Sequence, residues 1–162
     1  MTGLNLTIND KPVRFALKNF SARIVPEPLL KIAGQVMRSS VEQTFRDQGS
    51  PAGSWAPLAA STLKRAKGGV GRKILIRSGR LKNSVTYTVS GNILTIGTNL
   101  KYAAIHQKGG VAGRRGPFKK KNARRPEIPA RPYLVFRPED PQRMKAAMER
   151  YIDAVAQEEG LK

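Results

Sequence analysis

With 162 residues, of which 40% are hydrophobic and 25% charged, the chain has the size and composition of one folded domain and not of a disordered segment. It has no cysteine, which excludes disulfides and thiolate metal sites, and one histidine, which cannot build a zinc site unaided. The formal net charge of +19 causes strong self-repulsion, so the chain needs an acidic counterpart such as nucleic acid, an acidic protein or anionic lipid.

The first predicted element is an amino-terminal hairpin extension over residues 1–25. Residues 4–8 and 13–17 alternate apolar and polar side chains, and residues 9–12 between them are turn formers. Residues 1–6 lack the pattern of a secretory signal, and no stretch approaches the roughly 20 apolar residues of a membrane span. We therefore expect no membrane partner and residence in a cytoplasm.

A long helix is predicted next, over residues 28–48. Its apolar side chains, from Leu29 to Phe45, recur at steps of three and four residues, which is the spacing of one helical face. A proline suits the first turn, and the Gly-Ser-Pro after residue 48 suits the end. Residues 49–77 follow as a connecting loop around Trp55, with room for one short helix over 59–66.

Residues 78–137 are predicted to form the sheet region. Residues 84–89 and 93–98 are rich in β-prone side chains and flank a Gly-Asn turn, which indicates a hairpin. Residues 102–107 have the character of one or two helical turns, and residues 133–136 that of a further strand.

The last predicted element is a helix over residues 138–159, which begins at an Asp-Pro pair and carries Met144, Met148 and Val155 on one face. Together these elements predict a single α+β domain over 1–162. We expect an antiparallel sheet of about four strands packed with two long helices, and a long basic loop.

The basic loop, residues 108–127, is too polar to pack alone. It belongs to a wider stretch, residues 48–126, that holds 17 Lys or Arg residues and no Asp or Glu. Such a run is often only a solvated surface, but this one exceeds what solubility requires. We therefore favour contact with DNA phosphates or an acidic partner, without reading of base sequence. The loop cations are Arg114, Arg115, Lys119, Lys120, Lys121, Arg124 and Arg125.

Catalysis has little support in the residue inventory. The stretch without carboxylates removes the paired acids that nucleases and glycosidases need. His106 is a lone histidine on a short helix, which is more often a packing or interface residue than a catalytic one. The GGVGRK sequence at 68–73 lacks the spacing and the hydroxyl of a phosphate loop. We expect no enzymatic activity, no metal and no cofactor.

Several short motifs occur in series in the second half of the chain. They are ILIRSGRLKNS at 74–84, VTYTV at 85–89, LTIGTNLKYAAIHQKGG at 94–110 and IPARPYLVF at 128–136. In their order and spacing they resemble the Mu-like phage virion morphogenesis family, also called the tail completion family. The resemblance covers roughly residues 29–155, and Trp55 with the Pro-Leu pair after it fits the upstream part of the family.

The resemblance implies a structural virion protein of a tailed phage, assembled in the host bacterial cytoplasm. It implies a homo-oligomeric ring, with sixfold symmetry expected, that joins head-connector and tail-tube proteins in the neck. We expect the basic loop of such a ring to face double-stranded DNA in the channel or acidic partner surfaces. It implies no catalytic residues. Which layer of the neck the ring forms, the terminator, the stopper or the adaptor, stays open.

Four residues of the motifs are candidate subunit-interface residues: Tyr102, His106, Arg131 and Tyr133. Three of them have a plainer alternative, because Tyr102 and His106 can simply cover the core of the sheet and Arg131 can pair with a local acid. The alternative function is a free, sequence-independent nucleic-acid-binding protein of phage origin, which uses the same basic stretch as a monomer.

Overall fold

The structure, a computed structural model, describes residues 11–65, 73–111 and 127–161. In chain order the elements are α1 (Lys11–Arg23), α2 (Pro26–Asp47), β1 (Gly49–Ser50), β2 (Gly53–Ser54), α3 (Ala60–Arg65), α4 (Arg80–Asn83), β3 (Thr86–Ser90), β4 (Ile93–Gly97), α5 (Ala103–Lys108), β5 (Gly110–Val111), β6 (Glu127–Ile128) and α6 (Asp140–Glu158). The mixture of helices and small antiparallel sheets confirms the α+β class.

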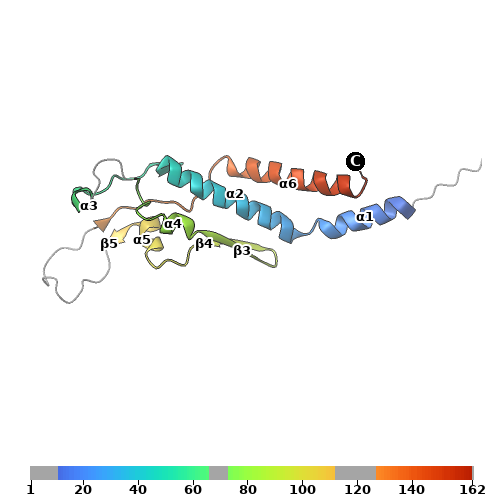
Figure 1. Cartoon of the computed structure of the whole chain (residues 1–162), viewed down its shortest axis with the longest axis horizontal. Coiled ribbons are helices and arrows are strands. Elements are labelled where there is room, and N and C mark those ends of the chain that lie inside the picture. Colours follow the sequence, from blue (N-terminus) through green and yellow to red (C-terminus); the bar gives the residue numbers. More distant parts are fainter. Residues whose placement is uncertain (1–10, 66–72, 112–126, 162) are drawn as a thin grey trace, which may run out of the picture.

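Helix α2 is the central element, with α6 along one side and the β3–β4 hairpin along another (Figure 1). The predicted apolar face of α2 is the buried one, and Val41 and Phe45 lie in the core. Gly34 lets the hairpin approach, because a Cβ there would lie 2.4 Å from Cδ2 of Tyr87. The position therefore has no room for a side chain unless the ring moves.

The hydrophobic core lies around the carboxy-terminal half of α2 and is centred on Phe45. The Phe45 ring lies 5.5 Å from the Trp55 ring, edge to face, and 5.5 Å from the tilted Tyr133 ring. Leu81 and Val85 complete the cluster from α4 and the start of the hairpin. Such aromatic pairs add a modest attraction to the burial of apolar area, so this cluster fixes the 131–134 segment against α2.

The sheets differ from the prediction. The described residues form three separate antiparallel pairs, β1–β2, β3–β4 and β5–β6, and not one sheet of four strands. The β3–β4 hairpin is where the sequence predicts it, with Thr86 opposite Gly97 and a turn at Gly91, whose φ is 56°. The predicted strand at 133–136 is wrong, because that segment is irregular, with a bend at Leu134, and pairs with no strand among the described residues.

The amino-terminal hairpin is also a wrong prediction where it can be tested. Residues 13–17 lie in helix α1, and residues 4–8 lie outside the described part of the chain. The alternation at 13–17 coexists with a helical spacing, since Val13, Leu17, Phe20 and Ile24 follow one another at steps of four, three and four residues. Pro12 fits the first turn of a helix better than the turn of a hairpin.

The other boundaries shift by a few residues. Helices α2 and α6 cover Pro26–Asp47 and Asp140–Glu158, where the sequence predicts 28–48 and 138–159. The predicted connecting loop at 49–77 contains the β1–β2 pair and α3, which matches the short helix expected at 59–66. Among the described residues, no helix is both long and apolar enough to span a membrane.

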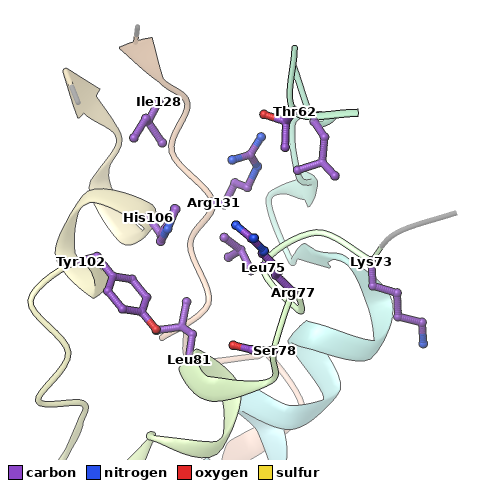
Figure 2. Close-up of a pocket in the computed structure, with 11 residues that line it drawn as sticks. Thr62, Lys73, Leu75, Arg77, Ser78, Leu81, Tyr102, His106, Ile128 and Arg131 are labelled. Carbon is purple, nitrogen blue, oxygen red and sulfur yellow. The ribbon is translucent and has the colours of Figure 1, made fainter. Parts of the chain in front are cut away.

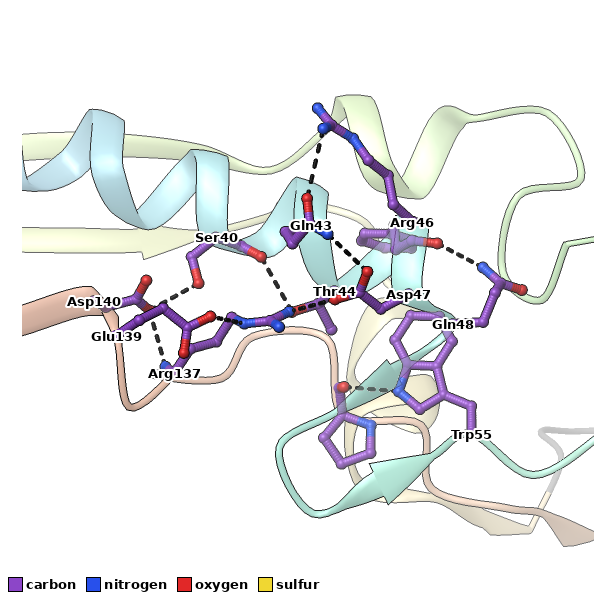
Figure 3. A network of polar contacts seen from close by, with 12 residues as sticks. Ser40, Gln43, Thr44, Arg46, Asp47, Gln48, Trp55, Arg137, Glu139 and Asp140 are labelled. Carbon is purple, nitrogen blue, oxygen red and sulfur yellow. Dashed lines mark hydrogen bonds and ion pairs between the residues drawn. The ribbon is translucent and has the colours of Figure 1, made fainter. Parts of the chain in front are cut away.

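A polar network fixes the start of α6 against α2 (Figure 3). Asp140 is fully buried, and its Oδ2 accepts hydrogen bonds from Ser40 Oγ at 2.7 Å and from the Arg137 backbone N–H at 2.8 Å. The Arg137 guanidinium pairs with Asp47 at 2.9 Å and with Glu139 at 2.6 Å. These contacts hold the chain just after the 131–134 segment, which bears part of the candidate site.

Candidate functional site

Three of the four predicted interface residues surround one place on the molecule. The Arg131 backbone N–H donates to the His106 carbonyl oxygen at 2.7 Å, and the Tyr102 and His106 rings meet edge to face at 5.9 Å. Tyr102 is 41% exposed, whereas Tyr133 is 1% exposed and belongs to the core. Tyr102, His106 and Arg131 therefore remain the candidate interface residues, and the Tyr133 ring packs in the core beneath them.

The segment after β6, residues 129–134, is held by α5 in place of a neighbouring strand; we call it the strap. Gln107 Oε1 accepts from the backbone N–H groups of Tyr133 and Leu134 at 3.0 Å each, and Gln107 Nε2 donates to the Leu134 carbonyl at 3.1 Å. One amide thus satisfies three backbone groups, which explains why this segment needs no strand partner. The sequence motifs at 102–109 and 128–134 form one structural unit.

A close backbone contact completes this unit. Gly109 has a φ of 73°, and a Cβ there would lie 2.8 Å from the Ala130 backbone nitrogen. Both the left-handed conformation and the close approach require glycine. The strap can therefore lie against the end of α5 only because the motif ends in Gly.

Arg131 ties the strap to the segment that follows β2. Its Nε donates to the Ala56 carbonyl and its Nη2 to the Pro57 carbonyl, both at 2.9 Å. Trp55 Nε1 donates in the reverse direction, to the Pro132 carbonyl at 2.9 Å. The local acid expected as an alternative partner is absent among the described contacts of Arg131, and burial lowers the pKa of its guanidinium. The site thus contains a buried cation whose partners, within the described part of the chain, are carbonyl oxygens.

A cavity of about 430 Å³ opens beside α5 and the strap (Figure 2). Part of its lining is apolar and comes from Leu58, Leu75 and Leu81. Its basic lining residues are Lys73, Arg77 and Arg131, together with His106, and none of the lining residues among those described is acidic. Figure 2 shows the Arg77 side chain directed toward the space between His106 and Arg131, whereas Lys73 points away at the rim.

One wall of the cavity carries backbone strain. Leu75 has a φ of 62°, the left-handed region that residues with a side chain seldom adopt. The neighbouring Ile74 is clamped by Gln48, whose amide accepts from the Ile74 backbone N–H and donates to its carbonyl at 3.3 Å. A strained residue of this kind persists only where its surroundings impose it, and such residues gather at binding sites.

His106 contributes a buried polar atom. Its Nδ1 has no hydrogen-bond partner within the part of the chain that the structure describes. Burial lowers the pKa of the imidazole, and the charge of Arg131 lowers it further. His106 is therefore neutral near pH 7, so the positive charge of the cavity comes from its Lys and Arg residues.

The seven predicted loop cations, Arg114, Arg115, Lys119, Lys120, Lys121, Arg124 and Arg125, lie outside the described residues. The two ends of their loop are described and adjoin, since β5 and β6 pair through Gly110 opposite Ile128 and Val111 opposite Glu127. Ile128 also lines the cavity, so the loop begins and ends beside it.

The described cations of the stretch without acids remain uncompensated. Arg77, Arg80 and Lys101 have no ion pair among the described residues, whereas the acids of α2 and α6 are already paired within the chain. Sequence reasoning missed the roles of Gln107, Lys73 and Arg77. Gln107 lies inside a quoted motif, and the two cations lie in the basic stretch but outside its densest run.

The chain is similar in sequence to known phage and prophage proteins. The chain matches the phage virion morphogenesis family over residues 8–153. It is 37% identical over 113 residues to "Mu-like prophage FluMu G protein 2" of Haemophilus influenzae, covering 70% of this chain and 68% of that protein. It is 29% identical over 136 residues to "Putative capsid assembly protein G" of Escherichia phage Mu, covering 81% and 82%. No solved structure matches.

Proposed function

The chain belongs to the phage virion morphogenesis family, and from this premise we propose that it is a structural subunit that assembles into a ring at the head–tail junction. A role in phage virion assembly follows from the family itself. The ring, its position in the neck and the absence of catalysis are our proposal, and the residue inventory and the surface of the chain support them.

The ring proposal rests on apolar side chains and strand edges that a single chain leaves exposed. Helix α1 has no buried residue, and its Val13, Phe15 and Leu17 are 51–68% exposed. Ile93 at the hairpin tip and Phe136 after the strap are exposed as well. Two-stranded sheets are marginal alone and offer open edges to a neighbouring chain. Copies of the chain are the natural cover for these surfaces in a symmetric assembly.

Charge supports a position beside DNA or acidic proteins. Six copies would carry +114, six times the +19 of one chain. A ring with that charge is stable only if polyanions or acidic neighbours compensate it. The basic loop, whose two ends meet at β5 and β6, is the candidate for contact with DNA in the channel or with head-connector and tail-tube proteins.

The test is the assembly state of the purified full-length chain. We expect rings in electron micrographs and a hexamer mass in native mass spectrometry, formed more readily when short duplex DNA is added and less readily as salt rises. A chain that stays monomeric at every salt concentration, with DNA present or absent, would contradict the proposal.

The basic stretch also favours a second candidate, a free nucleic-acid-binding protein. Deletion of residues 112–125 separates the two. A free binding protein then loses DNA affinity together with most of its salt dependence, and it stays a monomer before and after the deletion. A ring subunit with the same deletion loses part of its contact with its assembly partners, so virion yield falls even where DNA binding is weak.

A further inference from the structure

We propose that the cavity beside α5 receives an acidic segment of a different virion protein, with one carboxylate near Arg77 and Arg131 and a neighbouring apolar side chain on the leucines. This rests on the proposed function, because it names the chemistry of one partner in the assembly.

The charge of the cavity sets the first requirement. Arg77 and Arg131 line it, no lining residue among those described is acidic, and His106, which also lines it, is kept neutral by burial. Arg131 is preorganised, because two of its donors are fixed on the Ala56 and Pro57 carbonyls. A guanidinium held in this way, with the exposed Arg77 at the same cavity, attracts a carboxylate, which accepts hydrogen bonds from a guanidinium with matching geometry.

The apolar lining sets the second requirement. Leu58, Leu75 and Leu81 line the same cavity as the cations, and Leu75 is held there in a strained conformation. A DNA backbone presents phosphates and sugars and gains little from apolar contact, whereas a peptide can bury one apolar side chain next to its carboxylate. A volume of about 430 Å³ lies within the range of sites that enclose small ligands, and it suits a short stretch of peptide.

A second copy of the chain is a poor source of that carboxylate. The acids of α2 are paired with Lys31, Arg46 and Arg137, and those near the end of α6 with Arg23. Asp140 is fully buried. Apart from Glu127, which has no ion pair among the described residues, a copy would have to break such a pair to fill the cavity, so we favour an acidic protein of another kind as the occupant.

Photo-crosslinking inside assembling particles tests the occupant directly. The photoreactive residue p-benzoylphenylalanine replaces Thr62, which is exposed at the cavity. This chain is supplied to a phage that lacks its own copy, the particles are irradiated, and crosslinked peptides are identified by mass spectrometry. We expect a peptide of another virion protein that carries Asp or Glu within a few residues of an apolar side chain.

Three other outcomes overturn the proposal. A crosslink to a peptide of this chain makes the cavity an interface between copies, and a crosslink to DNA makes it a phosphate site. Particles that assemble without any crosslink leave the cavity without an occupant.

A charge reversal with a matched control tests the chemistry. Arg77→Glu places a carboxylate in the cavity, and Arg80→Glu makes the same change three residues away, at a residue that does not line it. Both arginines are exposed and have no ion pair among the described residues, so both variants should fold. We expect R77E to lower the crosslink yield at least about tenfold, since like charges at an interface oppose binding strongly. R80E should stay within about threefold of wild type, because peripheral charges matter less.

Equal crosslink yields for R77E, R80E and wild type would overturn the proposal. Failure of the proposed function has a different signature. If a phage without any copy of the chain still makes complete virions, the assembly role itself is wrong. If such a phage fails but R77E performs as well as wild type, only the assignment of the cavity is wrong.

Discussion

Removal of the Gln107 amide should loosen the strap without disturbing the rest of the core. The side chain makes three hydrogen bonds to the backbone of Tyr133 and Leu134, at 3.0, 3.0 and 3.1 Å. Each such bond contributes about 1 kcal/mol, and buried backbone groups left without a partner add to the loss. Gln107 is partly exposed, so water can replace some of the lost partners. We therefore expect Gln107→Ala to lower the free energy of unfolding by about 2 kcal/mol.

This loss is measurable in two ways. For a domain of this size about 2 kcal/mol lowers Tm by roughly 4–8 °C, and the urea midpoint should fall with an unchanged m-value. Gln43→Ala is the matched control, because its side chain bonds only to exposed partners on the same helix. It should change the free energy by less than about 0.5 kcal/mol. A Gln107→Ala variant as stable as this control would refute the view that one amide takes the place of a strand.

The remaining predictions concern packing, pH and the buried carboxylate. Gly34→Ala should lower the free energy of unfolding by about 1–3 kcal/mol, because its Cβ would overlap the Tyr87 ring, and should become stabilising in a Tyr87→Ala background; urea melts of all variants decide this. Burial lowers the pKa of His106, so the neutral side chain's contribution to the free energy of unfolding is fully present above the unfolded-state pKa of about 6.5 and is lost as the pH falls below it. Between pH 7.5 and 5.5, Tm should therefore drop more for wild type than for His106→Gln. Asp140→Ala should cost about 2–4 kcal/mol, since Ser40 loses its buried acceptor, and a loss under 1 kcal/mol in denaturant melts would contradict the network.

Some elements could be predicted because their sequence pattern fits one structure only. The spacing of apolar residues through α2 extends over 22 residues, too long to be mistaken for a strand. The β3–β4 hairpin combines β-prone residues with a Gly-Asn turn, and its pairing follows from that turn. In both cases the signal is local and repeated, so tertiary contacts did not need to be known.

Other elements could not be predicted because their pattern fits two structures or depends on distant residues. Residues 13–17 satisfy both a strand and a helix, and the structure has the helix. The strap has strand-like composition, but its backbone partner is the side chain of Gln107, which no strand pattern reveals.

The candidate site shows the same division. Tyr102, His106 and Arg131 were identified from the motifs, and the structure brings them together. Arg77 and Leu75 join them at the cavity through a loop clamped by Gln48, a contact between residues 26 positions apart. Nothing in the local sequence indicates that contact.

Electron microscopy of phage particles made without the chain will decide whether the chain completes the junction between head and tail. We expect filled heads and separate or irregular tails, with joined virions restored when the wild-type chain is supplied from a plasmid. Intact, infectious virions of normal tail length in the absence of the chain would contradict it.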